Sequence, residues 1–212
     1  MKRIIFLVLA CFLAACAGPN PNPGERITDV SWTSGQHIQG WPAVLERAQR
    51  GQPWAQLRMG IFYVYGWGVE QSFEEAAKWY ARASVQLTDG DWANGLLVGA
   101  YGKAGYFNQN SDAYMARYNL SEFFLNARGV KKDNVMAYAL INSVSKAKKD
   151  EPIFFCCEFS GGRYVAASDV QKRLDEIKSS MSTVELDRAS NIPEAELVKM
   201  LNAVAQGKAY KL

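Results

Sequence analysis

Residues 55–83 read AQLRMGIFYVYGWGVEQSFEEAAKWYARA. The apolar residues of this stretch recur every three or four positions on both sides of a glycine-containing turn, a spacing typical of two amphipathic helices. Gly66 is suited to end the first helix in the left-handed conformation, and Ser72 with Glu75 forms a capping box that begins the second. The stretch therefore predicts a pair of helices joined by a short turn, the first of them beginning near Pro53.

Gly60 lies in the middle of the first predicted helix, where glycine costs about 0.5–1 kcal/mol relative to alanine. A glycine at such a position is best explained by a neighbouring helix that packs closely against it. On the second predicted helix, Ala76, Tyr80 and Ala83 form one stripe with small residues at its two ends. We therefore expect a close helix–helix approach at this unit.

A degenerate second copy of this pattern follows further along the chain, at the offset that brings Ala55 onto Ala116. The same offset aligns Tyr63 with Phe124, Gly68-Val69 with Gly129-Val130 and Ala76 with Ala137, while Asp133 takes the place of Ser72. A weaker copy, marked by Ala93 and Tyr101, lies between the two, and residues 42–50 read as the second helix of a leading half-unit. Because such units cannot bury their apolar face alone, they stack, and the sequence predicts an all-α protein built as an α/α solenoid.

This pattern resembles the Sel1-like repeat, a relative of the tetratricopeptide (TPR) repeat. The residues that carry the resemblance are Ala55, Met59, Gly60, Tyr63, Gly66, Gly68, Val69, Ala76, Trp79, Tyr80 and Ala83. The match is strongest over residues 48–86 and extends more weakly over residues 113–145. The resemblance implies a solenoid of Sel1-like, TPR-like helix pairs and an adaptor role, in which a concave, helix-lined surface holds another protein.

The same resemblance implies which side chains would touch a partner. In related repeats the first helix of each unit faces the concave side, so its positions that are not used for packing are the candidates. They are Leu57, Ile61 and Tyr65 in the first unit and, at the aligned positions of the second unit, Tyr118, Glu122 and Asn126. We therefore expect a partner protein or peptide to bind on this face.

Residues 1–15 are typical of a secretory signal peptide. Lys2 and Arg3 give a basic start, and the apolar run of residues 4–12 is too short to span a bilayer as a helix. The run is followed by Leu-Ala-Ala-Cys, ending at Cys16, which resembles a bacterial lipobox. The lipobox implies cleavage before Cys16 and acylation of its thiol. The alternative is an ordinary signal peptide that has a cysteine at its cleavage site.

The residues that follow Cys16 predict a tether and a destination. Residues 19–24 read PNPNPG, and alternating prolines set an extended backbone that cannot form a helix. We expect this spacer to run to residue 40, with ordered structure from about Trp41. Ala17, in a place where aspartate would retain the protein at the inner membrane, favours the outer membrane by resemblance to Gram-negative lipoproteins. The expected location is the bacterial cell envelope, with the protein lipid-anchored and facing the periplasm.

The C-terminal part departs from the repeat. We expect helices beginning near Ser168, Thr183 and Pro193, which would close the apolar end of the solenoid as a cap. A small separate helical subdomain is the alternative, and the apolar stretch 153–159 could be a strand, a helical turn or a plug under a loop. The predicted organisation is thus a signal peptide (1–15), a lipidated cysteine with its tether (16–40), a repeat region (41–149) and a C-terminal helical cap (150–212).

Charge and composition argue against several classes of function. The chain has 24 basic and 21 acidic residues, and removal of the signal peptide with its two basic residues leaves 22 against 21. No basic cluster exceeds residues 131–132 or 146–149, whereas nucleic-acid binding needs a concentrated positive face. His37 is the single histidine and lies in a polar segment ahead of the first predicted helix, so a histidine-based triad or metal site has little support. We expect no catalytic residue, no metal and no cofactor.

The remaining cysteines leave their redox state open. Cys11 leaves with the signal peptide, and Cys156 and Cys157 are adjacent in the chain. Adjacent Cα atoms lie about 3.8 Å apart, closer than the usual disulfide span of about 4.4–6.8 Å, so a ring between neighbours would be strained. Buried thiols acting as small apolar groups are the favoured interpretation, with a vicinal disulfide or an intermolecular bridge as alternatives.

These features together predict a non-catalytic, membrane-anchored scaffold that binds an envelope protein or peptide through its repeats. Two alternatives remain at the level of the sequence. One is a structural envelope subunit that assembles with itself, and the other is an enzyme that acts on cell-wall material, for which the chain offers no convincing pair of acidic residues.

Overall fold

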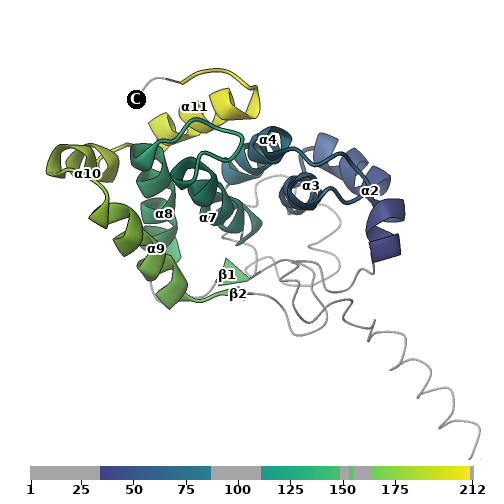
Figure 1. The fold of residues 1–212 in the computed structure, drawn as a ribbon, viewed down its shortest axis with the longest axis horizontal. Helices are drawn as coiled ribbons and strands as arrows, with labels where there is room; N and C mark the ends of the chain where they lie inside the picture. Colours follow the sequence, from purple (N-terminus) through teal and green to yellow (C-terminus); the bar gives the residue numbers. More distant parts are fainter. Residues whose placement is uncertain (1–33, 87–110, 149–152, 155–163, 211–212) are drawn as a thin grey trace, which may run out of the picture.

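The computed structural model describes residues 34–86, 111–148, 153–154 and 164–210 (Figure 1). The signal peptide, Cys16, the tether up to residue 33, the weak middle copy and the pair Cys156 and Cys157 lie outside these residues, so what was predicted for them stays a prediction. Among the described helices, none is both long enough and apolar enough to cross a membrane.

The described chain is helical apart from one short strand pair. The helices are α2 (Ser34–Gln49), α3 (Pro53–Tyr65), α4 (Phe73–Ser84), α7 (Ser111–Leu125), α8 (Asn134–Lys148), α9 (Ala167–Ser179), α10 (Thr183–Ser190) and α11 (Glu194–Ala205). The strands β1 (Ile153–Phe154) and β2 (Tyr164–Val165) pair antiparallel, with Ile153 opposite Val165. The apolar stretch after residue 152 therefore begins as a strand, one of the three possibilities left open by its sequence.

The helices stack in the order of the chain, as a solenoid requires. Each of α2, α3, α4, α7 and α8 packs against the next, and α3 also contacts α7 (Figure 1). Helices α9 and α10 continue the stack against α8, whereas α11 turns back and packs along α4 and α8. The predicted all-α solenoid is confirmed, and the C-terminal helices share one apolar cluster with the repeats.

The first helix begins earlier than predicted. Helix α2 starts at Ser34, so it includes His37 and has Pro42 in its interior, and the predicted tether boundary at residue 40 is wrong. The sequence predicts a helix that starts at residue 42, whereas in the structure Pro42 lies inside α2, where proline supplies no N–H to the helix hydrogen bonds. Val44 and Ala48, one turn apart, are buried against α3 and Trp79, so this contact holds α2 in the stack despite the missing bond.

The two helix pairs repeat each other in their backbone hydrogen bonds. The N–H of Ser72 donates to the carbonyl of Tyr63 at 2.9 Å, and at the aligned place in the second pair Asp133 donates to Phe124 at 3.1 Å. At both positions the side chain also caps the second helix, since the Ser72 hydroxyl accepts from the Glu75 N–H at 3.2 Å. The equivalent bond, from the Met136 N–H to the Asp133 carboxylate, is 2.9 Å. The offset found in the sequence is therefore that of a structural repeat.

The turns of the two pairs also share their left-handed positions. Gly66 and Gly68 have φ angles of 71° and 70°, and the equivalent Ala127 and Gly129 have 53° and 63°. Alanine in this conformation is unusual because its Cβ crowds the backbone. Gly129 cannot be replaced in the same way, because a Cβ there would lie 2.2 Å from the backbone carbon of Phe73 at the start of α4. This glycine allows the turn of the second pair to abut the first.

Two predicted caps need correction. The capping box of α4 is only half formed. Glu75 pairs with Lys78 at 2.8 Å instead of accepting from the Ser72 N–H, because that N–H already donates to the Tyr63 carbonyl.

Helix α9 begins at Ala167 rather than after a Ser168 cap, and the Asp169 carboxylate accepts a hydrogen bond from the N–H of residue 166 at 3.3 Å. The complete capping box of α10, from Ser182 and Glu185, and the start of α11 after Pro193 agree with the predicted starts.

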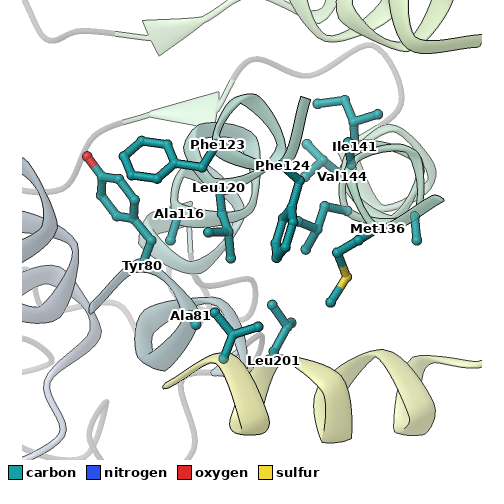
Figure 2. Packing of buried hydrophobic residues seen from close by; sticks show 14 of the residues in the cluster. Tyr80, Ala81, Ala116, Leu120, Phe123, Phe124, Met136, Ile141, Val144 and Leu201 are labelled. Carbon is teal, nitrogen blue, oxygen red and sulfur yellow. The ribbon is translucent and has the colours of Figure 1, made fainter. Parts of the chain in front are cut away.

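The core joins side chains from α4, α7, α8 and α11 (Figure 2). Tyr80 and Phe123 meet edge to face with ring centroids 5.4 Å apart, and Leu201 of α11 lies below Leu120 of α7. Burial raises the pKa of Tyr80 well above its usual value. Because the aromatic pair spans the two repeats, this apolar cluster continues from one repeat into the other, and a second cluster joins α2, α3 and Trp79.

The close approach predicted at Gly60 is between α3 and α4. A Cβ built on Gly60 would lie 2.4 Å from two carbons of the Tyr80 ring, closer than side chains can approach. Helix α3 therefore passes directly over the ring. In the second pair Ser121 takes the position of Gly60, and Ile141 takes that of Tyr80. Because isoleucine is smaller than tyrosine, it leaves space for serine where the first pair requires glycine.

Arg117 is a fully buried charge at the centre of the stack. Its guanidinium donates to the backbone carbonyl of Ser84 at 3.0 Å, to the Ser143 hydroxyl at 2.7 Å and to the Glu194 carboxylate at 3.0 Å. A second bond to Glu194 makes that pairing bidentate. Arg117 thus connects the end of α4, the middle of α8 and the first residue of α11 from its own position on α7.

Replacement of Gly60 by alanine should destabilise the protein by about 1–3 kcal/mol, because the added methyl group meets the Tyr80 ring. Helix propensity alone would make the alanine variant more stable by about 0.8–1 kcal/mol, so the sign of the change in unfolding free energy distinguishes the two effects. Urea unfolding followed by circular dichroism measures it. The cost should shrink in a Tyr80→Leu background, and a Gly60→Ala protein more stable than the parent would contradict the close packing.

Replacement of Arg117 by lysine should cost about 2–4 kcal/mol, because one ammonium group cannot serve a carbonyl, a hydroxyl and a carboxylate held in a planar fork. The matched control is Arg128→Lys, where the arginine side chain is 47% exposed and pairs with Glu122. That change should cost less than about 1 kcal/mol. Equal shifts of the urea midpoint for the two variants would show that Arg117 contributes no more than a surface charge.

Candidate partner-binding surface

Two of the predicted partner-binding residues are part of the core. Leu57 is fully buried and Ile61 is 2% exposed, and both belong to the apolar cluster that α3 shares with α7. The prediction that these positions are unused in packing is therefore wrong. The first helices of the two units, α3 and α7, touch each other, so the side chains between them face a neighbouring helix rather than a partner.

Tyr65 is the exposed residue of the first predicted set. Its side chain is 45% exposed at the last position of α3, and its ring stacks on Trp67 with centroids 4.8 Å apart and planes 20° from parallel. The Phe62 ring also neighbours Trp67, with their centroids 6.4 Å apart. The stack keeps an exposed aromatic face in a fixed orientation, and a fixed ring loses little entropy when it binds.

A hollow of about 620 Å³ lies on the turn between α3 and α4. Its lining residues are Trp41, Tyr63, Gly68, Val69, Glu70, Gln71, Ser72 and Glu75. The amide of Gln71 donates to the carbonyl of Val64 at 2.7 Å, which ties the turn to α3. We define the α3–α4 turn surface as this hollow together with the neighbouring Tyr65 and Trp67.

The chemistry of the α3–α4 turn surface suits a protein partner. It offers aromatic side chains, Trp41 and Tyr65 among them, beside the carboxylates of Glu70 and Glu75. Aromatic anchors surrounded by polar groups are the usual arrangement where a few residues supply most of the binding energy. Among the described residues, no group of histidine, cysteine or acidic side chains is arranged to hold a metal ion.

The predicted residues of the second unit are occupied within the chain. The Arg173 guanidinium of α9 lies 3.9 Å from the centroid of the Tyr118 ring, donates to the Tyr118 carbonyl at 2.8 Å and pairs with Glu122 at 3.3 Å. Arg128 pairs with the other oxygen of Glu122 at 3.0 Å. Burial raises the pKa of Tyr118. Helix α9 thus takes the place that a partner was predicted to take, while Asn126 remains exposed.

Sequence reasoning missed part of the turn surface. Trp67 is not among the candidates predicted from the sequence, although its position between two glycines places it in the turn. Trp41 was not identified, because its contact with Gly68 joins residues far apart in the chain: a Cβ on Gly68 would lie 2.2 Å from the Trp41 ring. The Gly-Trp-Gly triplet at residues 66–68 is the signal that could have indicated this surface.

The structure and sequence are similar to known repeat proteins. The Sel1 repeat family model matches residues 55–84 and 115–142, so the chain contains two Sel1 repeats. The fold resembles the crystal structure of a protective antigen present in uropathogenic Escherichia coli strains that displays an SLR fold, with a TM-score of 0.53 and 15% sequence identity. The likeness covers 85% of this chain but 30% of the antigen's chain. No curated protein matches the chain.

Aspartate substitutions at Ile61 and Tyr65, on one face of α3, should distinguish a buried position from an exposed one. Ile61→Asp places an unpaired charge in the core and should cost more than about 4 kcal/mol or prevent folding, whereas Tyr65→Asp should cost no more than about 1 kcal/mol. Thermal unfolding followed by circular dichroism gives both values. If the Ile61→Asp protein unfolds at nearly the parental temperature, the assignment of this position to the core is wrong.

Proposed function

We propose that this protein is a non-catalytic scaffold of the bacterial cell envelope, anchored by a lipid on Cys16 and binding another envelope protein or peptide through its Sel1 repeats. The observation that carries the proposal is the pair of Sel1 repeats together with the exposed stack of Tyr65 on Trp67. Sel1 repeats are generally protein-interaction modules, which supports a protein partner.

The repeats support binding because they offer a preformed surface. The α3–α4 turn surface rests on α2, α3 and α4, and Ser72, Gln71 and Gly66 hold the turn through backbone and side-chain hydrogen bonds. A partner would bury the Tyr65 ring, while Glu70 and the neighbouring polar groups form the rim. Since these groups are already ordered, binding does not require the folding of a loop.

The lipid would contribute to the proposed function by holding the protein at the membrane, and not by adding affinity for the partner. Acylation adds about 0.8 kcal/mol for each methylene that enters the bilayer, and more than one chain is needed for stable anchoring. The Leu-Ala-Ala-Cys sequence that ends at Cys16 and the following proline-rich spacer are the features that favour this anchor. Anchoring would confine the search for an envelope partner to the plane of the membrane.

The anchor is tested by processing and fractionation in a Gram-negative host. The parental protein should be found with the membranes, incorporate labelled palmitate and accumulate as a precursor under globomycin. A Cys16→Ser variant should lose all three properties while the repeat domain still folds. Membrane fractionation and processing that are identical for the two proteins would rule out the lipid at this residue.

The scaffold role is tested by site-specific photo-crosslinking in cells, with the photoreactive group placed near Tyr65. The expected result is a discrete partner protein that is lost in the Tyr65→Asp variant. Val184, which is 76% exposed on α10, provides the matched control, because Val184→Asp adds the same charge to another exposed apolar position. Retention of the crosslink in Tyr65→Asp would exclude this surface, and a crosslink only to a second copy would favour self-assembly instead.

A further inference from the structure

A second hollow, of about 440 Å³, lies between the start of α4, the turn that connects α7 to α8, and the C-terminal end of α11. We call it the α4–α11 pocket. It shares no lining residue with the hollow of the α3–α4 turn surface, and none of the partner-binding residues predicted from the sequence lines it. The pocket is absent from any single repeat, because α11 and the chain after it form one of its walls.

The floor of the pocket is apolar. Ala77, Phe124 and Val204 come from three different helices, and each is largely buried in the core beneath the pocket. Val130 adds a partly buried side chain from the turn. An apolar side chain that covers this floor removes apolar surface from water, which favours binding by about 25 cal/mol for each Å² covered.

The rim of the pocket carries an excess of positive charge. Four lysines and two carboxylates line it, so its formal net charge is +2. Both carboxylates already have partners: Glu74 pairs with Lys78 at 2.8 Å, which lowers the pKa of Glu74, and Asp133 accepts bonds from the Met136 N–H and the Tyr210 hydroxyl, each at 2.9 Å.

The other three lysines of the rim are Lys131, Lys132 and Lys208. All three are exposed, and among the described residues none of them takes part in an ion pair or a side-chain hydrogen bond. They come from the α7–α8 turn and from the chain after α11, so the pocket brings together charges that lie far apart in the sequence. The positive charge is local, because the chain as a whole is close to neutral.

The chain after α11 is fastened in place as a wall. Gly207 turns the chain with a φ of 67°, and the Lys208 N–H donates to the carbonyl of Ala203 at 2.9 Å. The Tyr210 ring then meets Phe124 edge to face at 6.0 Å, and its hydroxyl donates to Asp133. Burial and the nearby carboxylate raise the pKa of Tyr210, so the hydroxyl keeps its proton. Lys208 is thereby held beside the turn that carries Lys131.

We propose that the α4–α11 pocket binds an acidic peptide segment of a partner protein, with one apolar side chain on the floor and flanking carboxylates on Lys131, Lys132 and Lys208. Charge complementarity determines the acidic character, and the recessed floor determines the apolar residue. A membrane surface would place anionic headgroups on the rim and leave the floor uncovered, so the geometry favours a peptide. This site depends on neither the lipid at Cys16 nor the Tyr65 surface.

The test uses the purified protein without its signal peptide and a fluorescein-labelled synthetic peptide, Asp-Glu-Asp-Leu-Phe-Glu-Asp-Glu, measured by fluorescence anisotropy. The triple variant Lys131→Glu, Lys132→Glu, Lys208→Glu should bind at least about tenfold more weakly than the parent. The matched control reverses three exposed lysines elsewhere, Lys172→Glu, Lys178→Glu and Lys199→Glu, and should bind like the parent. Thermal unfolding confirms that both variants fold.

Two changes to the peptide test separately its apolar contact with the floor and its charge contacts with the rim. Replacing Leu-Phe by Ser-Ser should weaken binding through loss of the apolar contact, and replacing the acidic residues by lysine should abolish it. Raising the salt from low to high concentration should weaken binding of the acidic peptide, because exposed charges are screened.

Several results would overturn the proposal. They are no binding by the parent at millimolar peptide, equal loss of binding in both triple variants, or indifference to the Leu-Phe replacement. Binding to vesicles of anionic phospholipid that depends on Lys131, Lys132 and Lys208, without binding to the peptide, would assign the pocket to the membrane instead. The Tyr65→Asp variant should bind the peptide normally, so failure of the pocket and failure of the α3–α4 turn surface can be told apart.

Discussion

The packing of the described domain depends on the hydrogen bonds of Arg117. A buried guanidinium is tolerated only when it is paired and its donors are satisfied, because removal of a charge from water costs several kcal/mol. Arg117 meets this requirement with groups on three other helices: the last residue of α4, Ser143 of α8 and Glu194 at the start of α11. None of these helices can shift far without leaving part of the charge unpaired.

The position of α11 follows from that constraint and changes the shape of the solenoid. Glu194 places the beginning of α11 over Arg117, and at the other end Arg82 of α4 donates to the carbonyl of Ala205 at 3.1 Å. The chain after α11 is thereby directed to the α7–α8 turn, where Tyr210 reaches Asp133. At the far end of the stack Arg173 occupies the surface of α7. The C-terminal helices thus close surfaces of the repeats and leave the α3–α4 turn surface and the α4–α11 pocket open.

The two repeats show how one backbone accommodates different side chains. The side-chain oxygens of Ser72 and Asp133 each accept a hydrogen bond from the N–H three residues further along the chain, because both residues supply a short side-chain acceptor at the N-cap. Gly60 is required by the Tyr80 ring, whereas the second repeat has Ile141 at the place of the ring and tolerates Ser121. The size of the residue tolerated on the first helix of each pair therefore depends on the size of the residue at the aligned position of the second helix.

The helix pairs, their turns and the offset between the two copies can be predicted from the amino-acid sequence, because helix periodicity, caps and left-handed glycines act over a few neighbouring residues. The resemblance to the Sel1-like repeat added Tyr65 as a candidate contact, and its side chain is 45% exposed. Contacts between helices far apart in the chain bury Leu57 and Ile61, cover Tyr118 with Arg173 and bring the C-terminal chain to the α7–α8 turn. Periodicity could not predict these outcomes, because it shows that a helix face is apolar without showing which distant segment covers it.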